Sequence, residues 1–404
     1  MIKESENINL LWANRYCLLD TSSGASISIR EMLHRLTKRN FDVDVVGATV
    51  FDSEAGKYRI ASDLKRLQEK EGKIIRVKDG DLSHNLVKTK KATSREITLE
   101  ELNVIYSLYV ATLDKNKPDV FWFYGGNSFD YLLPYEAKRR GIATIAYLAN
   151  GNYSGSRWCE DVDLILTDSQ ATADMYTNIL GRTPTPIGKF IPPESYVAKS
   201  HTRDHVTFVN PVLAKGAAVV VQLALALEEK RPDIKFEIVE SRGGWSEVLQ
   251  KVSAGMGKPR NSLSNVIVTP NTDDMRPVYA RSRVILAPSM WWESGGRVLA
   301  EAMLNGIPAI VTNRGGCPEM IEDAGIKITL PDKFYEKPYS KILPREAIQQ
   351  VTTAIEAMFD NPNMYANLVK KALIVGKKKH NIERNSDNLS SIIRNLVQKN
   401  KLNR

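Results

Sequence analysis

The stretch VILAPSMWWESGGRVLAE, residues 284–301, decides the fold of this chain. It opens with a short apolar run that ends at Pro288, which predicts a buried strand followed by a loop. A helix should follow the loop, with Ser294 as its N-cap and an apolar stripe that includes Val298 and Leu299. A strand, a glycine turn and the start of a helix together make a pocket in which backbone amides can bind a phosphate group.

Two glutamates, Glu293 and Glu301, stand eight positions apart in this stretch. At a rise of about 1.5 Å per residue, eight positions span roughly 12 Å, which is about the reach of a diphosphate with a sugar ring at either end. One carboxylate could therefore hold each sugar. The bare spacing would more often be a chance pair on a solvated helix face, so the interpretation depends on the residues around it.

Those surrounding residues resemble glycosyltransferase family 4, whose members have the GT-B fold. The resemblance runs through Pro288–Ala302 and continues in Asn305–Pro308 and Asn313–Glu319. It implies a retaining transferase that takes a sugar from a nucleoside diphosphate. No residue in the pattern is an evident nucleophile, so the implied route is attack from the face of the departing phosphate, with that phosphate acting as base. The protein would then contribute positioning and charge stabilisation.

The resemblance assigns a role to five residues. Glu293 would contact the donor sugar, and Glu301 would hold the ribose of the nucleotide. Backbone amides of Gly295, Gly296 and Arg297 would bind the diphosphate.

A second motif, Ala214-Lys215-Gly216, follows an apolar run and precedes an apolar helical stretch. A cation at the mouth of such a loop can neutralise the leaving diphosphate, so Lys215 is a candidate catalytic residue, with an ordinary exposed lysine as the alternative. In the family an arginine usually stands five residues before this lysine, but here the corresponding position in the donor site is Asn210. Arg242 and Arg314 are further candidates to carry the charge.

Apolar runs alternate with helical stretches along the chain, which predicts an α/β protein with a doubly wound sheet in each of two domains. We expect residues 1–190 to form a Rossmann-like acceptor domain, and the family resemblance implies that a C-terminal helix at about 380–404 completes it. Residues 191–380 should form a Rossmann-like nucleotide-sugar domain that faces the first across a cleft. The predicted strands are 8–12, 41–46, 120–123, 144–148, 164–167, 206–209, 235–239, 265–268, 284–287 and 308–312.

The first domain offers two weaker candidates. Gly24 lies in the loop after the first strand, where family members carry a glycine turn that faces the donor phosphates. A tight turn that merely requires glycine is the alternative for this position. After the strand at 144–148, where many members place a histidine, this chain has Ala149 and Asn150. The amide of Asn150 could hydrogen-bond a sugar or acceptor hydroxyl.

The composition bounds the remaining choices. The chain has 404 residues, of which 43% are hydrophobic, and it has no run of eighteen apolar residues and no leader-like N-terminus, so we expect a cytoplasmic protein. Its net charge of +9 is consistent with peripheral contact with an anionic membrane on the inner face or with a solvated basic surface. The basic clusters lack interleaved aromatic residues, which argues against a nucleic-acid partner.

No metal or other cofactor is expected. The five histidines have no metal-ligand spacing, and the three cysteines, Cys17, Cys159 and Cys317, are scattered and odd in number. The partners would be a nucleotide sugar as donor and a saccharide, lipid-linked or protein acceptor. The resemblance to family 4 implies a hexosyltransferase-type enzyme of bacterial glycoconjugate or surface polysaccharide synthesis. The alternatives are a GT-B phosphorylase, a nucleotide-sugar epimerase and a non-catalytic partner subunit.

Overall fold

The computed structural model describes residues 6–66, 73–93 and 96–403, and the chain divides into two compact α/β units. The N-terminal unit runs to Phe190 and takes up the chain again from Ile382, whereas the C-terminal unit is Ile191–Asn381. Residues 1–5, on which the expectation about a leader partly rests, lie outside the described residues. Within the described part, no helix is both long enough and apolar enough to cross a membrane.

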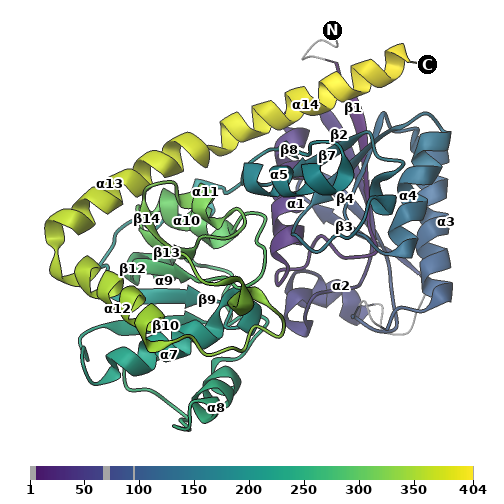
Figure 1. The fold of residues 1–404 in the computed structure, drawn as a ribbon. Coiled ribbons are helices and arrows are strands. Elements are labelled where there is room, and N and C mark those ends of the chain that lie inside the picture. The colour runs from purple at the N-terminus through teal and green to yellow at the C-terminus, as the bar shows by residue number, and fades with distance from the viewer. Residues whose placement is uncertain (1–5, 67–72, 94–95, 404) are drawn as a thin grey trace. The chain divides into compact units, whose positions relative to one another are not determined.

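The N-terminal unit is built on one largely parallel sheet (Figure 1). Its strand order is β3-β4-β2-β1-β5-β6-β7-β8, in which only the β3–β4 pair is antiparallel. The strands are β1 (Ile8–Ala13), β2 (Phe41–Ala48), β3 (Ile74–Asp79), β4 (Leu82–Val87), β5 (Val120–Phe123), β6 (Ala143–Leu148), β7 (Leu164–Thr167) and β8 (Thr185–Pro186). The helices are α1 (Gly24–Thr37), α2 (Ala61–Arg66), α3 (Leu99–Asn116), α4 (Ser128–Arg139), α5 (Gln170–Leu180) and α14 (Ile382–Leu402), with 3₁₀ turns η1 (Glu54–Ile60) and η2 (Arg157–Cys159).

Helices cover both faces of this sheet, which is why its strands read as continuous apolar runs. In β1, Leu10 and Trp12 pack into the cluster that contains α1 and α14 residues, while Leu11 and Ala13 pack into the cluster that contains α3 and α4 residues. Figure 1 shows α3 and α4 together on one side of β1 and β2. The period of two along the strand therefore divides one apolar run between two cores.

The hairpin of β3 and β4 is absent from the predicted strands. Its strands alternate between buried and more exposed positions, so that Ile75 in β3 and Leu82 and His84 in β4 are buried while the residues next to them are half-buried or exposed. A search for uninterrupted apolar runs passes over such half-exposed strands. The turn Gly80-Asp81 between them, with Gly80 at φ +56°, is the local signal that could have revealed the hairpin.

The C-terminal unit carries a six-stranded, all-parallel sheet in the order β11-β10-β9-β12-β13-β14. The strands are β9 (His205–Val209), β10 (Lys235–Val239), β11 (Val266–Thr269), β12 (Ser282–Ala287), β13 (Ala309–Thr312) and β14 (Gly325–Ile328). The helices are α6 (Pro193–Tyr196), α7 (Ala217–Glu228), α8 (Trp245–Gly255), α9 (Arg276–Arg281), α10 (Arg297–Leu304), α11 (Cys317–Ile321), α12 (Arg345–Asp360) and α13 (Pro362–Lys379), with 3₁₀ turns η3 (Leu213–Lys215) and η4 (Asp332–Tyr335). The predicted class, an α/β protein with two Rossmann-like parallel sheets, is confirmed.

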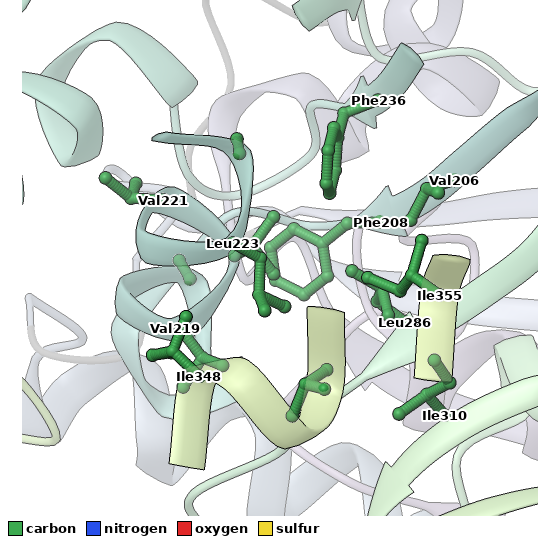
Figure 2. Packing of buried hydrophobic residues seen from close by; sticks show 14 of the residues in the cluster. Val206, Phe208, Val219, Val221, Leu223, Phe236, Leu286, Ile310, Ile348 and Ile355 are labelled. Carbon is green, nitrogen blue, oxygen red and sulfur yellow. The ribbon is translucent and has the colours of Figure 1, made fainter. Parts of the chain in front are cut away.

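The largest core of this unit lies between the sheet and the helices α7 and α12 (Figure 2). Phe208 and Phe236 project from neighbouring strands toward Leu223 of α7, and Ile348 and Ile355 of α12 lie in the same cluster. The opposite face of the sheet packs on α10, α11 and α13. Both faces are covered, so the edge where the strands end is the place at which polar groups can gather.

Candidate functional site

The candidate site lies on three loops at the carboxyl edge of the C-terminal sheet. The loops follow β9, β12 and β13, which are neighbours in the sheet. The strand order reverses between β9 and β12, because the chain builds outward from β9 to β11 and then returns to place β12 on the other side of β9. Ligands of open α/β sheets bind at such a reversal, and it is here that Lys215 and Glu293 meet.

The side chain of Glu293 is buried, with 8% of the residue exposed. Its Oε1 atom accepts hydrogen bonds from Nζ of Lys215, from Nε1 of Trp291 at 2.8 Å and from Oγ of Ser289 at 3.1 Å. Burial alone would raise the pKa of this carboxyl, but the Lys215 charge and the three hydrogen bonds outweigh burial and lower it. Glu293 is therefore held as a carboxylate in a nearly dry position.

Lys215 is not an ordinary exposed lysine. It ends the 3₁₀ turn after β9, only 23% of its side chain is exposed, and its ammonium group pairs with Glu293. The same ammonium lies 5.3 Å from the centre of the Trp291 ring. The two residues to which the sequence assigned separate roles, one at the sugar and one at the diphosphate, thus form one ion pair.

Two glycines allow the loops to approach this closely. Gly216 has φ +88°, and a Cβ there would lie 2.1 Å from the carbonyl oxygen of Pro288. Gly315 has φ +60°, and a Cβ there would lie 2.4 Å from the carbonyl oxygen of Glu293. That same oxygen accepts a hydrogen bond of 2.8 Å from the amide of Gly316. Any side chain at positions 216 or 315 would push the loops apart and displace the ion pair.

Glu301 belongs to a second network. Its Oε1 pairs with Nε of Arg297 at 2.8 Å, and its Oε2 accepts a hydrogen bond from the hydroxyl of Tyr279. The guanidinium of Arg297 in turn lies 4.7 Å from the centre of the Tyr196 ring. Glu301 is 4% exposed, so these contacts fix its orientation before any ligand arrives.

The start of the helix differs from the prediction. We expected Ser294 to be the N-cap, but the N-cap is Gly296 and α10 begins at Arg297. Glu293 instead forms an isolated β-bridge and Ser294 lies at a bend, and the carbonyl of Glu293 accepts the hydrogen bond from the turn at Gly316. Gly295 and Gly296 therefore lie in the segment immediately before the helix. The side chain of Arg297, for which only a backbone role was expected, is committed to Glu301.

Asn210 directly follows β9 and has a left-handed backbone, with φ +64°. Its amide nitrogen donates to the carbonyl of Val239 at 2.8 Å, whereas its side-chain Oδ1 is buried without a hydrogen-bond partner among the described residues. Arg314 lies in the turn after β13, beside the rings of Tyr335 and Trp292. Arg242 is an exposed residue in the loop after β10.

The remaining two candidates belong to the N-terminal unit. Gly24 is the first residue of α1, has no positive φ, and has nothing within 4 Å of the position of a Cβ. The alternative that a tight turn requires this glycine therefore has no geometric support. Asn150 follows β6, and its Oδ1 accepts a hydrogen bond of 3.0 Å from the amide of Asn152. Its side chain stabilises its own loop and keeps its NH₂ group as a donor.

Sequence reasoning missed the residues that orient the two glutamates. Tyr279, from α9, and Tyr196, from α6, contact the Glu301–Arg297 pair, and Ser289 contacts Glu293. Ser289 stood inside the quoted motif, so its position was a usable signal. No signal in the sequence pointed to Tyr196 or Tyr279, because only the tertiary fold brings α6 and α9 beside α10. In the described part of the chain, no group of three or more His, Cys, Asp or Glu side chains could hold a metal ion.

Comparison with known proteins agrees with this geometry. Residues 197–375 match the family described as Glycosyl transferases group 1, so the C-terminal unit is a domain of that family. The chain is 29% identical over 145 residues to spore coat protein SA of Bacillus subtilis. That match covers 35% of this chain and 38% of the other protein, so it spans well under half of the curated relative.

Solved structures resemble both units of the chain. Sucrose-phosphate synthase from Thermosynechococcus elongatus has a TM-score of 0.72 at 14% identity, over 97% of this chain and 100% of the other. Anabaena HepE in complex with UDP and glucose has a TM-score of 0.69 at 14% identity, over 96% of this chain and 100% of the other. At these identities the likeness shows the fold alone, which is that of GT-B glycosyltransferases.

Proposed function

We propose that this chain, whose residues 197–375 form a domain of the group 1 glycosyl transferases, is a retaining family 4 glycosyltransferase. It would transfer a hexose-like sugar from a nucleoside diphosphate to an acceptor hydroxyl. The observation that carries the proposal is the ion pair of Glu293 and Lys215 at the reversal of the strand order. An ionised carboxylate beside a cation, in a position largely closed to water, can bind sugar hydroxyls and the charge that develops on the diphosphate.

The chemistry follows from the charges at each end of the donor. Lys215 would stabilise the diphosphate as the bond to the sugar breaks, and Glu293 would hold the sugar hydroxyls. Glu301, already oriented by Tyr279 and Arg297, would accept hydrogen bonds from the ribose. The departing phosphate oxygen would take the proton of the acceptor hydroxyl. A protein cation at the diphosphate supports transfer without a metal, so we expect activity to survive chelation by EDTA.

Binding of a donor is the first test. A thermal-shift screen of nucleotide sugars should raise the melting temperature for one nucleotide class, because a ligand of the native state stabilises by RT ln(1 + [L]/Kd). UDP-glucose is a rational first probe because a structural neighbour, HepE, has been solved in complex with it. A screen in which no nucleotide sugar shifts the melting temperature would contradict the proposal.

Turnover is the second test. With a positive donor, the wild type should release nucleoside diphosphate only when an acceptor is present, and the product should keep the anomeric configuration of the donor. Release with inorganic phosphate as acceptor would indicate a phosphorylase, and conversion of the donor sugar without release would indicate an epimerase. Donor binding without any turnover would favour a non-catalytic partner subunit, which the departure at Asn210 makes worth testing.

The acceptor class is proposed from the curated relative. A match to a spore coat protein supports an acceptor in bacterial surface glycoconjugate or polysaccharide synthesis, whether saccharide, lipid-linked or protein. We propose a cytoplasmic enzyme that contacts the inner face of the membrane through its excess of basic residues. Co-sedimentation with anionic but not with neutral vesicles, abolished by high salt, would support this location, and equal recovery in the supernatant would contradict it.

A further inference from the structure

Arg314 lies in the turn after β13, on one of the three loops of the candidate site, and the sequence left it as one of two further candidates to carry the charge of the diphosphate. It follows β13, and its amide donates to the carbonyl of Thr312 at 2.8 Å. The next two residues, Gly315 and Gly316, form the turn that holds the backbone of Glu293. Arg314 is therefore anchored by the same turn that positions the predicted sugar-binding carboxylate.

The charge of Arg314 is not compensated. Lys215 is paired with Glu293, and Arg297 is paired with Glu301 at 2.8 Å. Among the residues that the structure describes, no carboxylate forms an ion pair with Arg314. The two pairs cancel, so the excess positive charge on these three loops comes from Arg314.

The guanidinium of Arg314 is held in place but not satisfied. Its centre lies 4.4 Å from the ring centre of Tyr335 and 5.8 Å from that of Trp292, which are distances for cation–π contact. Its Nε–H group is buried and has no hydrogen-bond acceptor in the described part of the chain. A buried donor without an acceptor destabilises the free protein, and a phosphate oxygen is the acceptor that a planar guanidinium binds best.

In family members an arginine at the position of Asn210 shares the diphosphate charge with the lysine, and the backbone at position 210 shows why such a second cation should come from another loop in this chain. Asn210 has φ +64°, a left-handed conformation that asparagine tolerates far better than a long side chain such as arginine. The arginine that family members place here would be strained on this backbone. The loop after β13 reaches the same edge of the sheet from the other side of β12.

We propose that Arg314 binds the diphosphate of the donor and supplies the second cation that position 210 does not provide. This assignment rests on the proposed function. Phosphate oxygens would accept hydrogen bonds from the guanidinium of Arg314 while its stem stays packed on Tyr335. Lys215, which is paired with Glu293, would then share the negative charge with Arg314 instead of neutralising it alone.

The test compares a nucleoside diphosphate with its own nucleoside. Calorimetric titrations would use the diphosphate of uridine, guanosine, adenosine, cytidine or thymidine that stabilises the wild type most, together with the matching nucleoside. In Arg314→Met, which keeps an apolar stem against the rings, we expect affinity for the diphosphate to fall about 10- to 100-fold, as for loss of a hydrogen bond to a charged group. Affinity for the nucleoside should stay within about twofold.

Arg260→Met is the matched control. Arg260 precedes β11 at the opposite edge of the same sheet, pairs with Glu228 at 2.7 Å and has 43% of its side chain exposed. This variant removes the same charge and should leave both affinities unchanged. Equal losses for diphosphate and nucleoside in Arg314→Met would show a packing role and overturn the assignment, as would no loss in either.

A measurement on the wild type covers the case in which Arg314→Met does not fold. The Nε–H resonance of Arg314, assigned as the one missing from Arg314→Lys, should shift when the diphosphate is added and not when the nucleoside is added. An unmoved resonance at saturating diphosphate overturns the assignment and leaves the proposed function intact. A wild type that binds none of the five diphosphates overturns both.

Discussion

Replacing Lys215 by methionine should reverse the sign of the pH dependence that Glu293 gives to stability. In the wild type the pKa of Glu293 is lowered, despite burial, by the ammonium of Lys215 and three hydrogen bonds. A carboxyl whose pKa is lower in the folded state than in the unfolded state stabilises the folded protein above its unfolded-state pKa of about 4.3. This contribution is lost as the pH falls through the folded-state pKa. The wild-type pair therefore stabilises at neutral pH and weakens in acid.

In Lys215→Met the same carboxyl keeps its burial and loses its counter-charge. Burial, the largest of the influences on it, then raises the folded pKa of Glu293 above the unfolded value. A carboxyl whose folded-state pKa is raised destabilises the folded protein at neutral pH, and this destabilisation disappears as the pH falls through the folded-state pKa. Unlike the wild type, the variant should become relatively more stable between about pH 7 and pH 5.

The size of the effect follows from the geometry. Removing one partner of a buried ion pair costs about 3–5 kcal/mol. The Lys215 side chain is 23% exposed, and Trp291 and Ser289 still donate to the carboxylate, so we expect about 2–3 kcal/mol at pH 7. In Lys215→Met with Glu293→Gln, no buried charge remains, and the double variant should lie within about 1 kcal/mol of Glu293→Gln alone.

Native-state hydrogen exchange read by mass spectrometry suits this assay, because it reports on peptides of the C-terminal unit without assuming one unfolding transition. Opening free energies of β9 and β12 peptides would be compared at pH 5, 6 and 7, after correction for intrinsic exchange. Peptides of β1 and β5 in the N-terminal unit serve as the internal control. A coupling below about 0.5 kcal/mol in the double-mutant cycle, or the same pH slope in wild type and Lys215→Met, would refute the reasoning.

Three further outcomes are expected. Tyr279→Phe removes the hydroxyl that orients Glu301, so nucleotide affinity should fall about 5- to 10-fold and discrimination against a 2′-deoxynucleotide should weaken. Tyr365→Phe removes a hydroxyl that contacts the backbone carbonyl of Arg283 at 2.9 Å and the side chain of Arg203, and it should change neither. Gly216→Ala places a Cβ 2.1 Å from a backbone oxygen at a residue with φ +88°, so it should lower the free energy of unfolding, measured by chemical denaturation, by about 2–4 kcal/mol. In the control variant Gly24→Ala the new Cβ would meet open space, and the loss should be less than about 0.5 kcal/mol. Glu237 is 1% exposed, and hydrogen bonds with His205 and Arg281 lower its pKa to about 2 despite its burial. Its contribution of about 3 kcal/mol to the free energy of unfolding should therefore be present above about pH 4.5 and lost toward pH 2. Glu237→Gln should flatten the acid side of the profile of stability against pH, and an unchanged profile would contradict this.

The sequence alone predicts most of the strands, because a parallel sheet covered on both faces requires continuous apolar runs. The runs at 120–123, 164–167 and 235–239 coincide with β5, β7 and β10. A strand that is not buried on both faces is found only where it still has an apolar run, as β11 does although Ile267 and Val268 are exposed. The β3–β4 hairpin alternates in burial, and β14 is buried only at Ile328, so neither presents an apolar run to find.

The candidate site was predictable to the extent that its residues share a loop. Glu293, Ser289 and Trp291 lie within five positions, and the motif that contains them is read directly from the chain. Tyr279 precedes Glu301 by 22 positions and comes from a different helix, so no local pattern connects them. The start of α10 was misplaced for a related reason, since the turn at Gly316 holds the carbonyl of Glu293 and the helix begins only beyond the serine with the better capping propensity.

The ion pair also limits what a single substitution can reveal about catalysis. Lys215 and Glu293 were assigned separate roles, one at the diphosphate and one at the sugar, yet each supports the other in the free protein. Loss of activity in a variant of one residue would therefore mix its own contact with the displacement of its partner. Effects of residues that act as a unit are not additive, so only the double variant separates the two. A diphosphate must in addition compete with Glu293 for the ammonium of Lys215. That competition costs less when another cation stands beside the site with no carboxylate of its own, which is the position that the described contacts give to Arg314.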